Sequence, residues 1–312
     1  MAYYLGIDGG GSKTTCVVGD ESSLLAAVTS GGSNITRVGE AGAREALQQA
    51  IREACLAARI NPQQVFCTCI GAAGAGRAEI ASTVRKIVAE IIPGEIEVVG
   101  DMEIALAAAF GKGPGVIVIA GTGSIVFGRD AQGKVARAGG WGFAISDEGS
   151  AHWIGLAAAR AVLRAADEVG EDQAERDPSW PARRLFSELK MAWSLDSLPQ
   201  LARAANANPD FAALFPAVLT AAEAGDVVAR QVIAEASREL AQLAGIVVRR
   251  LFSAAVSTSA VPMAMAGGVF RHAAMIRELF YNEVRAANPD VVLNPEVVDP
   301  VQGALRMARR AW

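Results

Sequence analysis

The chain is poor in the residues that build disulfide frameworks and metal centres. Of its 312 residues four are cysteine, all before residue 70, and two are histidine, His152 and His272. No CxxC pair occurs, so a disulfide-knotted fold and a structural zinc site are excluded. Cys67 and Cys69 share one face of a predicted strand in the run VFCTCIG, where we expect buried free thiols.

Two further absences narrow the class of protein. With 33 acidic and 29 basic side chains the net charge is −4, so there is no general positive field and we expect no nucleic-acid partner. Lys112 and Pro114 interrupt the best apolar run, 104–127, before it reaches the roughly 18–20 residues of a spanning helix, so no membrane association is expected. The opening MAYYLGID has no basic segment and is read as a strand, which favours a cytoplasmic location.

The remaining composition is that of a globular protein with a substantial core. Hydrophobic residues make up 52% of the chain and charged residues 20%, which excludes a disordered chain. At roughly 100 to 200 residues per domain, the length predicts two domains that could enclose a cleft.

Apolar periodicity divides the chain into alternating strands and helices, which is typical of an α/β fold. We expect a hairpin in YYLGIDGGGSKTTCVVGD, strands in QVFCTCIG, EIEVVG, GVIVIAGTGSIVFGRD and PMAMAGG, and helices over 40–59, 79–91, 102–110, 150–167 and 226–252. Asp299 as N-cap and Pro300 at the first helical position predict a C-terminal helix. The segment GKGPG, 111–115, cannot continue a helix, so the domain boundary is expected there.

Two hairpins of similar pattern open the two halves, which suggests an internal duplication. The first carries Asp8, Gly10, Gly11, Ser12, Lys13 and Thr14, and the second carries Gly121, Thr122 and Ser124. Neither is a P-loop or a GxGxxG motif, because a residue separates Gly11 from Lys13, position 126 is valine, and both turns run into strands.

Paired glycine hairpins have a physical use beyond tight turning. Glycine lets backbone N–H groups approach phosphate oxygens, and the hydroxyl groups add donors, so the two hairpins could clasp a triphosphate from both sides. Asp8, at a strand end, could hold Mg²⁺ through water. For a single hairpin a simple turn with glycine at positive φ would explain the sequence, but the two matched hairpins and a third glycine pair, Gly267 and Gly268, favour nucleotide binding.

In five ordered motifs the chain resembles the sugar-kinase, Hsp70 and actin superfamily, and within it the N-acetylglucosamine kinases grouped with the BadF/BadG type ATPases. The motifs are LGIDGGGSKTT, VVGD, IAGTGS, GGWGFAISDEGSAHWIG and MAGGVF. The resemblance implies two ribonuclease-H-like lobes around a central cleft: residues 1–115 completed by a C-terminal helix, 300–312, and residues 116–299 with helical insertions. It also implies ATP and Mg²⁺ as cofactors, a small amino sugar as substrate, Gly267 and Gly268 at the adenosine, and a homodimer.

The same resemblance assigns the candidate site residues. Asp101, whose commonest role at a helix start would be capping, is expected to take the proton of the sugar 6-hydroxyl as the oxygen attacks the γ-phosphate. Asn34 could be a turn residue, and Asp147 could cap the following helix, but both are expected to bind sugar hydroxyls together with Thr122. Gly140 and Trp141 fit a pocket wall, although a plain core role for Trp141 stays open.

The expected function is therefore ATP-dependent phosphorylation of the 6-hydroxyl of an amino sugar, with N-acetylglucosamine preferred. Glucosamine and N-acetylmuramic acid are alternatives. Trp141, Phe143 and Ala144 suit an acetyl methyl group whereas Asp147 and Glu148 suit an amine, so the segment supports both N-acetylglucosamine and glucosamine. An activator ATPase of 2-hydroxyacyl-CoA dehydratases is disfavoured, since its cluster cysteines lie in mid-chain and none follows Cys69. A sugar-responsive regulator is disfavoured because the chain begins inside its first strand.

Overall fold

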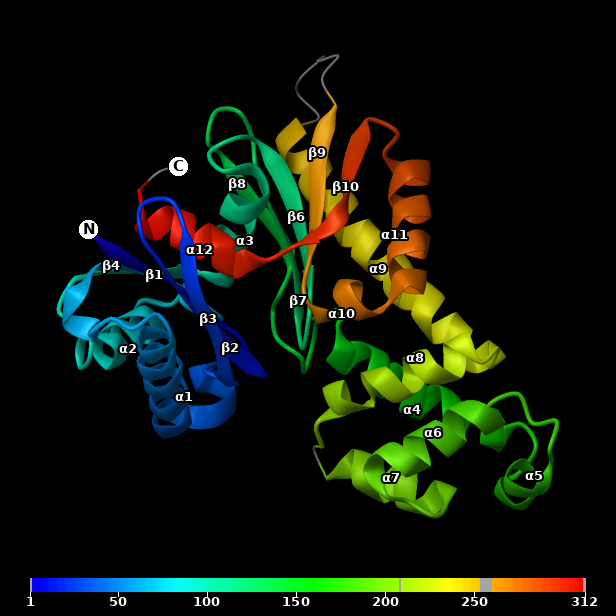
Figure 1. Cartoon of the computed structure of the whole chain (residues 1–312). Coiled ribbons are helices and arrows are strands. Elements are labelled where there is room, and N and C mark those ends of the chain that lie inside the picture. The colour runs from blue at the N-terminus through cyan, green and yellow to red at the C-terminus, as the bar shows by residue number, and fades with distance from the viewer. Residues whose placement is uncertain (1, 208, 253–259, 311–312) are drawn as a thin grey trace.

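The computed structural model describes residues 2–207, 209–252 and 260–310, and two five-stranded sheets organise it (Figure 1). The first sheet comprises β1 (Tyr3–Gly9), β2 (Lys13–Gly19), β3 (Leu24–Gly31), β4 (Val65–Ala72) and β5 (Glu95–Gly100). The second comprises β6 (Gly115–Ala120), β7 (Ser124–Arg129), β8 (Val135–Gly139), β9 (Val261–Ala266) and β10 (Val291–Val298).

The two sheets have the same topology. In the order β3-β2-β1-β4-β5, the first three strands in sequence form an antiparallel meander, and β4 and β5 then add parallel to β1. The order β10-β9-β6-β7-β8 repeats this scheme with β6 as the central strand. The predicted duplication is therefore present in the strand connections, and the predicted α/β class with two such lobes is confirmed.

Helices cover both sheets. Those that follow strands of the first sheet are α1 (Ile35–Ala57), η1 (Pro62–Gln64), α2 (Ala78–Ala89) and α3 (Asp101–Phe110). A helical region below the second sheet in Figure 1 contains α4 (Ala151–Asp167), α5 (Glu171–Arg176), α6 (Arg183–Trp193), α7 (Leu198–Asn206), η2 (Phe211–Leu214) and α8 (Phe215–Glu223). The chain continues through α9 (Val227–Phe252), α10 (Gly268–His272), α11 (Ala274–Ala287) and α12 (Pro300–Ala308).

Helices α3 and α12 lie between the two sheets. One side of α3, with Ile104, packs on α12 and β4, while its other side, with Ala105 and Leu106, packs on the second sheet. The two helices cross closely at Gly303, where a Cβ atom would clash with the carbonyl oxygen of Ile104. The C-terminal helix thus returns to the first sheet, while the boundary at 111–115 stays a prediction.

Three strands, β3, β8 and β10, are not predicted from the sequence, and all three are edge strands. β3 alternates between exposed and partly buried residues from Leu25 onward, β8 has five residues, and β10 is exposed at half of its residues and contains Pro295. Pro295 lies where the β9–β10 register shifts between Leu293 and Val297, which is the position that proline tolerates in a sheet. The three strands are not predicted because their apolar periodicity is weak.

Helix boundaries differ from expectation at two places. The helix expected from residue 40 begins at Ile35 and is kinked at Gly39, whose φ is 72°. The C-terminal helix begins at Pro300 as predicted but ends at Ala308, so its predicted extent to 312 is too long, and residues 311–312 lie outside the described part. Asp299 holds the N-cap position without a capping hydrogen bond from its side chain.

The described cysteines are all buried and free, as expected. Burial raises the pKa of the Cys16 and Cys69 thiols far above the ordinary value, which keeps them protonated. They act as small apolar side chains of the first lobe.

No single helix among the described residues is long and apolar enough to cross a membrane. The stretch Phe211–Glu223 and the helix Val227–Phe252 meet the length and composition test only as a pair, bent by 118°.

Candidate active site

The turns of the two glycine hairpins meet in space. The hydroxyl groups of Ser12 and Thr122, 110 residues apart in sequence, lie 2.8 Å from one another. A Cβ atom on Gly11 would lie 3.7 Å from the Cβ of Thr122. The fold therefore brings together the two turns that the sequence pairs by pattern, one at the end of each lobe's central strand.

The four hydroxyl residues of the hairpins divide into two pairs with different surroundings. Ser12 and Thr122 stand at the turns, but Thr14 and Ser124 are buried. Thr14 donates to Ser33 Oγ at 2.8 Å, and Ser124 donates to the carbonyl oxygen of Glu148 at 2.7 Å. The inner pair therefore anchors the neighbouring loops, and contact of these residues with phosphate stays a prediction.

The glycines of the hairpins also differ in what surrounds them. Gly10 closes its turn by donating from its backbone N–H to the carbonyl of Lys13 at 3.0 Å, and a Cβ there would lie 3.1 Å from that oxygen. Gly123 makes room for Asp147, whose Oδ2 would lie 2.6 Å from an added Cβ. Gly121 has no atom within 4 Å of such a Cβ and no positive φ, so neither packing nor backbone strain requires glycine there.

We expect Gly121→Ala to keep the fold while weakening ATP binding about 10- to 100-fold, the worth of one hydrogen bond to a charged group. The added methyl group would stand where a phosphate must approach the backbone N–H groups. Isothermal titration with ATP measures the effect. Gly76→Ala, at an exposed glycine that also has open space around its Cβ position, is the matched control. Unchanged affinity in Gly121→Ala would remove this turn from the phosphate site.

Carboxyl groups from three different elements gather where the lobes meet. Asp8 lies near the end of β1, Asp101 is the first residue of α3, and Asp147 precedes α4. The charge of Asp101 raises the pKa of both Asp8 and Asp147, which shows that the three groups share one electrostatic environment. A concentration of acids at this junction is expected where catalysis needs a base.

The pKa of Asp8 is raised from 3.8 to about 7, first by burial and then by the charges of Asp101 and Asp299. Lys13 and Arg271 act in the opposite direction with smaller effect. The negative charge of a carboxylate in this setting is poorly compensated. A divalent cation bound beside it would stabilise the charged form.

Among the described residues no group of three or more His, Cys, Asp or Glu side chains forms a metal-binding cluster. Mg²⁺ does not require one, because it keeps several waters and binds one or two carboxylates together with substrate phosphates. The raised pKa of Asp8 is consistent with binding of Mg²⁺ by a single carboxylate together with water and phosphate.

Asp101 is partly buried at the N-terminus of α3. Burial raises its pKa, and a hydrogen bond from the Met102 backbone N–H to its Oδ1, 3.1 Å long, works in the opposite direction. The N-cap of α3 is Gly100, whose own N–H donates to Glu103 Oε1 at 3.0 Å. Asp101 is therefore not the N-cap residue, and helix capping does not explain the aspartate at this position.

Asp147 is held in a strained loop between β8 and α4. Its φ is 63°, and Gly139, Gly140 and Gly142 of the same loop also have positive φ. Backbone N–H groups of Gly142 and Ser124 donate to its carboxylate, while burial raises its pKa. The cap of α4 is Ser150, which accepts from the Trp153 N–H at 3.1 Å, so a capping role for Asp147 is excluded.

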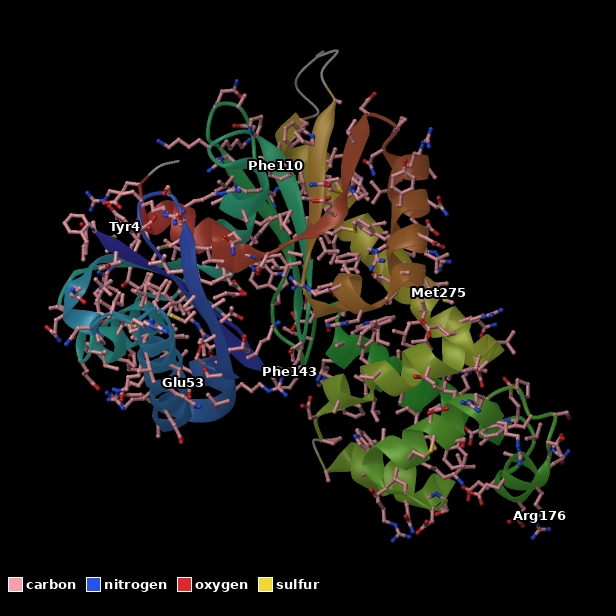
Figure 2. The ribbon with its side chains drawn as sticks, viewed as in Figure 1. Tyr4, Glu53, Phe110, Phe143, Arg176 and Met275 are labelled. Atoms are coloured by element: carbon pink, nitrogen blue, oxygen red, sulfur yellow. The ribbon has the colours of Figure 1, made fainter. Side chains whose placement is uncertain are left out.

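The aromatic residues of this loop are not part of the core. Trp141 is 69% exposed, with the guanidinium of Arg137 4.0 Å from its ring centroid. Phe143 is also exposed and contacts the ring of His152, with ring centroids 5.1 Å apart, and Figure 2 shows it where the two halves of the molecule approach each other. A core role for Trp141 is wrong, and a wall of the sugar pocket stays a prediction.

Asn34 is the N-cap of α1. Its Oδ1 accepts from the Thr36 N–H at 3.0 Å, and its own N–H donates to the Gly10 carbonyl at 3.2 Å. The cap fixes Asn34 beside the first hairpin. The predicted sugar contact is not tested by this arrangement.

Gly267 has a packing role that the sequence pattern could not show. Its φ is 100°, and a Cβ atom there would clash with the carbonyl of Ala120, at the start of the second hairpin turn. Gly268, the first residue of α10, has only His272 within 4 Å of its Cβ position. The glycine pair thus packs the end of β9 against the second hairpin, and its contact with adenosine stays a prediction.

Sequence reasoning missed Arg37 and Asp210, which form an ion pair at 2.7 Å across 173 positions of the chain. Arg37 lies beside Gly11, with Nη1 3.8 Å from where a Cβ would stand. Neither residue belongs to a recognisable motif. Only the folded arrangement of the lobes reveals the pair.

Two surface hollows of about 490 and 290 Å³ lie away from these carboxylates. One is lined by residues of β4 and β5 near Phe66 and Pro93, and the other by α4 near Trp153 and Arg160. Their linings contain none of the acids at the lobe junction, so the hollows do not mark the site.

Comparisons with known proteins identify the family of the chain. Residues 5–308 match the BadF/BadG/BcrA/BcrD ATPase family. An N-acetylmuramic acid/N-acetylglucosamine kinase of Clostridium acetobutylicum is 34% identical over 99% of both chains, and an N-acetyl-D-glucosamine kinase of Dictyostelium discoideum is 28% identical over 98% of this chain and 97% of that one.

Solved structures extend the comparison to the fold. A candidate N-acetylglucosamine kinase from Chromobacterium violaceum has a TM-score of 0.76 at 26% identity, with 99% of each chain covered. A ROK family glucokinase from Streptomyces griseus has a TM-score of 0.61 at 18% identity over 99% of each chain, which shows the shared fold alone. The chain belongs to the BadF/BadG/BcrA/BcrD ATPase family.

Proposed function

We propose that this protein transfers the γ-phosphoryl group of ATP to the 6-hydroxyl of an amino sugar, and that N-acetylglucosamine is its preferred substrate. The observation that carries the proposal is the gathering of Asp8, Asp101 and Asp147 beside the two facing glycine turns. The named relatives that match nearly the whole chain act on amino sugars.

In this mechanism Asp101 is the general base. A partly buried carboxylate with a raised pKa is a stronger base than a fully solvated one, and it can accept the 6-hydroxyl proton as that oxygen attacks phosphorus. The backbone N–H of Met102 holds one carboxylate oxygen in place, which leaves the other for the sugar.

The hairpins would position and neutralise the phosphates. The backbone N–H of Gly11 and the hydroxyls of Ser12 and Thr122 offer donors from both lobes, while the N–H groups of Gly10 and Gly121 close the two turns. Mg²⁺, when bound with ATP, would neutralise phosphate charge, and Asp8 is the carboxylate placed to hold it through water. Sugar recognition would come from Asn34, Asp147 and the loop that carries Trp141.

A coupled assay of ADP release tests the substrate. We expect sugar-dependent ADP release with N-acetylglucosamine, and lower kcat/KM with glucose, glucosamine, N-acetylmannosamine and N-acetylmuramic acid. A kcat/KM for glucosamine or N-acetylmuramic acid at least about tenfold above that for N-acetylglucosamine would contradict the preference but leave the kinase proposal intact. Light scattering in the same buffer would test the homodimer that the family resemblance implies.

A further inference from the structure

The ion pair between Arg37 and Asp210 joins the two halves of the molecule. Arg37 is in the first turn of α1, which packs on the first sheet, and Asp210 precedes η2 in the helical region beyond the second sheet. Arg37 Nη2 donates to Asp210 Oδ2 at 2.7 Å. Of the ion pairs found in the described part of the chain, it is the one that crosses between lobes.

The pair stands at the rim of the candidate site. Arg37 Nη1 is 3.8 Å, and the Cβ of Thr122 is 3.7 Å, from the position of a Cβ on Gly11. The charges of Arg37 and Asp210 both influence the pKa of His152, whose ring contacts Phe143 in the loop that precedes Asp147. The guanidinium therefore borders both the phosphate turns and the predicted sugar pocket.

Asp210 shows that a carboxylate fits against Arg37, and both partners of this ion pair are accessible to water. The side chains of Arg37 and Asp210 are 34% and 49% exposed, and an ion pair so accessible to water contributes little to stability. Asp210 keeps a second role without Arg37, because its Oδ1 accepts from the Ala212 N–H at 3.1 Å as the cap of η2. A carboxylate on a bound ligand could replace Asp210 at small cost.

Charge and depth both indicate which ligand group meets Arg37. Asp101 and Asp147 would repel an anionic substrate, and Arg37 is a cation at the rim that could offset them. Asp101 is partly buried where phosphoryl transfer would occur, whereas Arg37 is an exposed residue. A substituent at the outer side of the sugar, rather than the transferring phosphoryl group, would reach it.

We propose that Arg37 is a specificity-determining residue that binds a carboxylate carried by the amino sugar, in exchange for Asp210. The site then takes N-acetylhexosamines with an acidic ether substituent in addition to neutral N-acetylglucosamine. This inference rests on the proposed function. N-acetylmuramic acid, which carries a lactyl ether, is the probe, and its carboxamide has the same bulk without the charge.

Steady-state kinetics with the acid and the carboxamide test the proposal. Arg37→Met should lower kcat/KM for the acid about 10- to 100-fold more than for the carboxamide, because one charge-assisted hydrogen bond is lost. Asp210→Asn removes the competing carboxylate but keeps the cap oxygen, so it should raise the ratio of acid to carboxamide about threefold or more. Arg37→Lys should retain part of the wild-type preference for the acid over the carboxamide. Arg52→Met, on an exposed residue of α1, is the matched control and should leave the ratio at the wild-type value.

Each contrary outcome is distinct. Equal losses on acid and carboxamide in Arg37→Met, with unchanged circular dichroism, would place Arg37 on the phosphates and overturn the inference. So would a wild-type protein that phosphorylates N-acetylglucosamine but not N-acetylmuramic acid, and in that case the proposed function survives. If the wild-type protein phosphorylates no amino sugar, both the function and the inference fail.

Discussion

Asp101→Asn should lower kcat about 10²- to 10⁴-fold while the protein stays folded. The amide keeps an oxygen that can accept from the Met102 N–H, so the start of α3 is preserved, but it cannot take the proton of the sugar hydroxyl. Sugar-dependent ADP release measures the loss, and differential scanning fluorimetry checks the fold. Asp172→Asn, at an exposed acid of α5, is the matched control.

The same residue predicts a pH dependence. Because burial raises the pKa of Asp101, the fraction of active base falls as the pH is lowered through that pKa, and kcat should fall with it. At low pH the slope of log kcat against pH should approach one in the wild type. The residual activity of Asp101→Asn should lack the step assigned to this base. A variant with near-wild-type turnover would exclude Asp101 from the chemistry.

Asp8→Asn should have opposite effects on stability and on activity. The pKa of Asp8 is raised from 3.8 to about 7, so the native protein binds this proton more tightly than the unfolded chain does. The stability associated with the protonated group is present below pH 4 and is lost as the pH rises from about 4 to 7. Above pH 7 the folded protein carries a partly buried charge that costs free energy.

An asparagine at position 8 removes this cost. We expect Asp8→Asn to raise the free energy of unfolding by about 1 to 3 kcal/mol at pH 8, and by little at pH 4. At the same time its Mg²⁺-dependent turnover should fall at least about tenfold, because a carboxylate placed to hold the ion is lost. Urea unfolding at both pH values, with turnover measured over a Mg²⁺ titration, tests both effects. Equal stability of wild type and variant at pH 8 would show that Asp8 is not a strained carboxylate.

The central strands of each lobe are the part of the fold that the sequence predicts best. β1, β2, β6 and β7 are buried and rich in apolar and β-branched residues, and glycine turns separate them. The edge strands β3, β8 and β10 lack that signal, because one side or both sides of an edge strand face water. Their positions are set by pairing with a neighbouring strand, which is a tertiary effect.

The candidate site is also predicted only in part from the sequence. Motifs identify Asp8, Asp101, Asp147 and the hairpin turns, because a local pattern of strand end, glycine and polar residue marks each of them. The sequence does not distinguish hydroxyl groups at the turns from hydroxyl groups that face inward, and so it does not show that Thr14 and Ser124 are buried and bonded to other loops. That distinction depends on the partners Ser33 and Glu148, which come from other loops.

Contacts between residues that are far apart in the chain cannot be predicted from local sequence patterns. Arg37 and Asp210 meet only because α1 and the segment before η2 approach one another from different lobes. Trp141 likewise is exposed in a loop whose glycines, Gly139, Gly140 and Gly142, have positive φ angles that the sequence does not reveal. Composition gives no information on either feature.

The position of the transferred phosphoryl group tests the account most directly. After the protein is incubated with ATP, Mg²⁺ and N-acetylglucosamine, a two-dimensional ³¹P–¹H NMR spectrum of the product identifies the proton coupled to phosphorus. The account predicts one equivalent of ADP per sugar phosphate and coupling of phosphorus to the two H6 protons. Coupling to the anomeric proton, or ADP formed without any sugar phosphate, would contradict it.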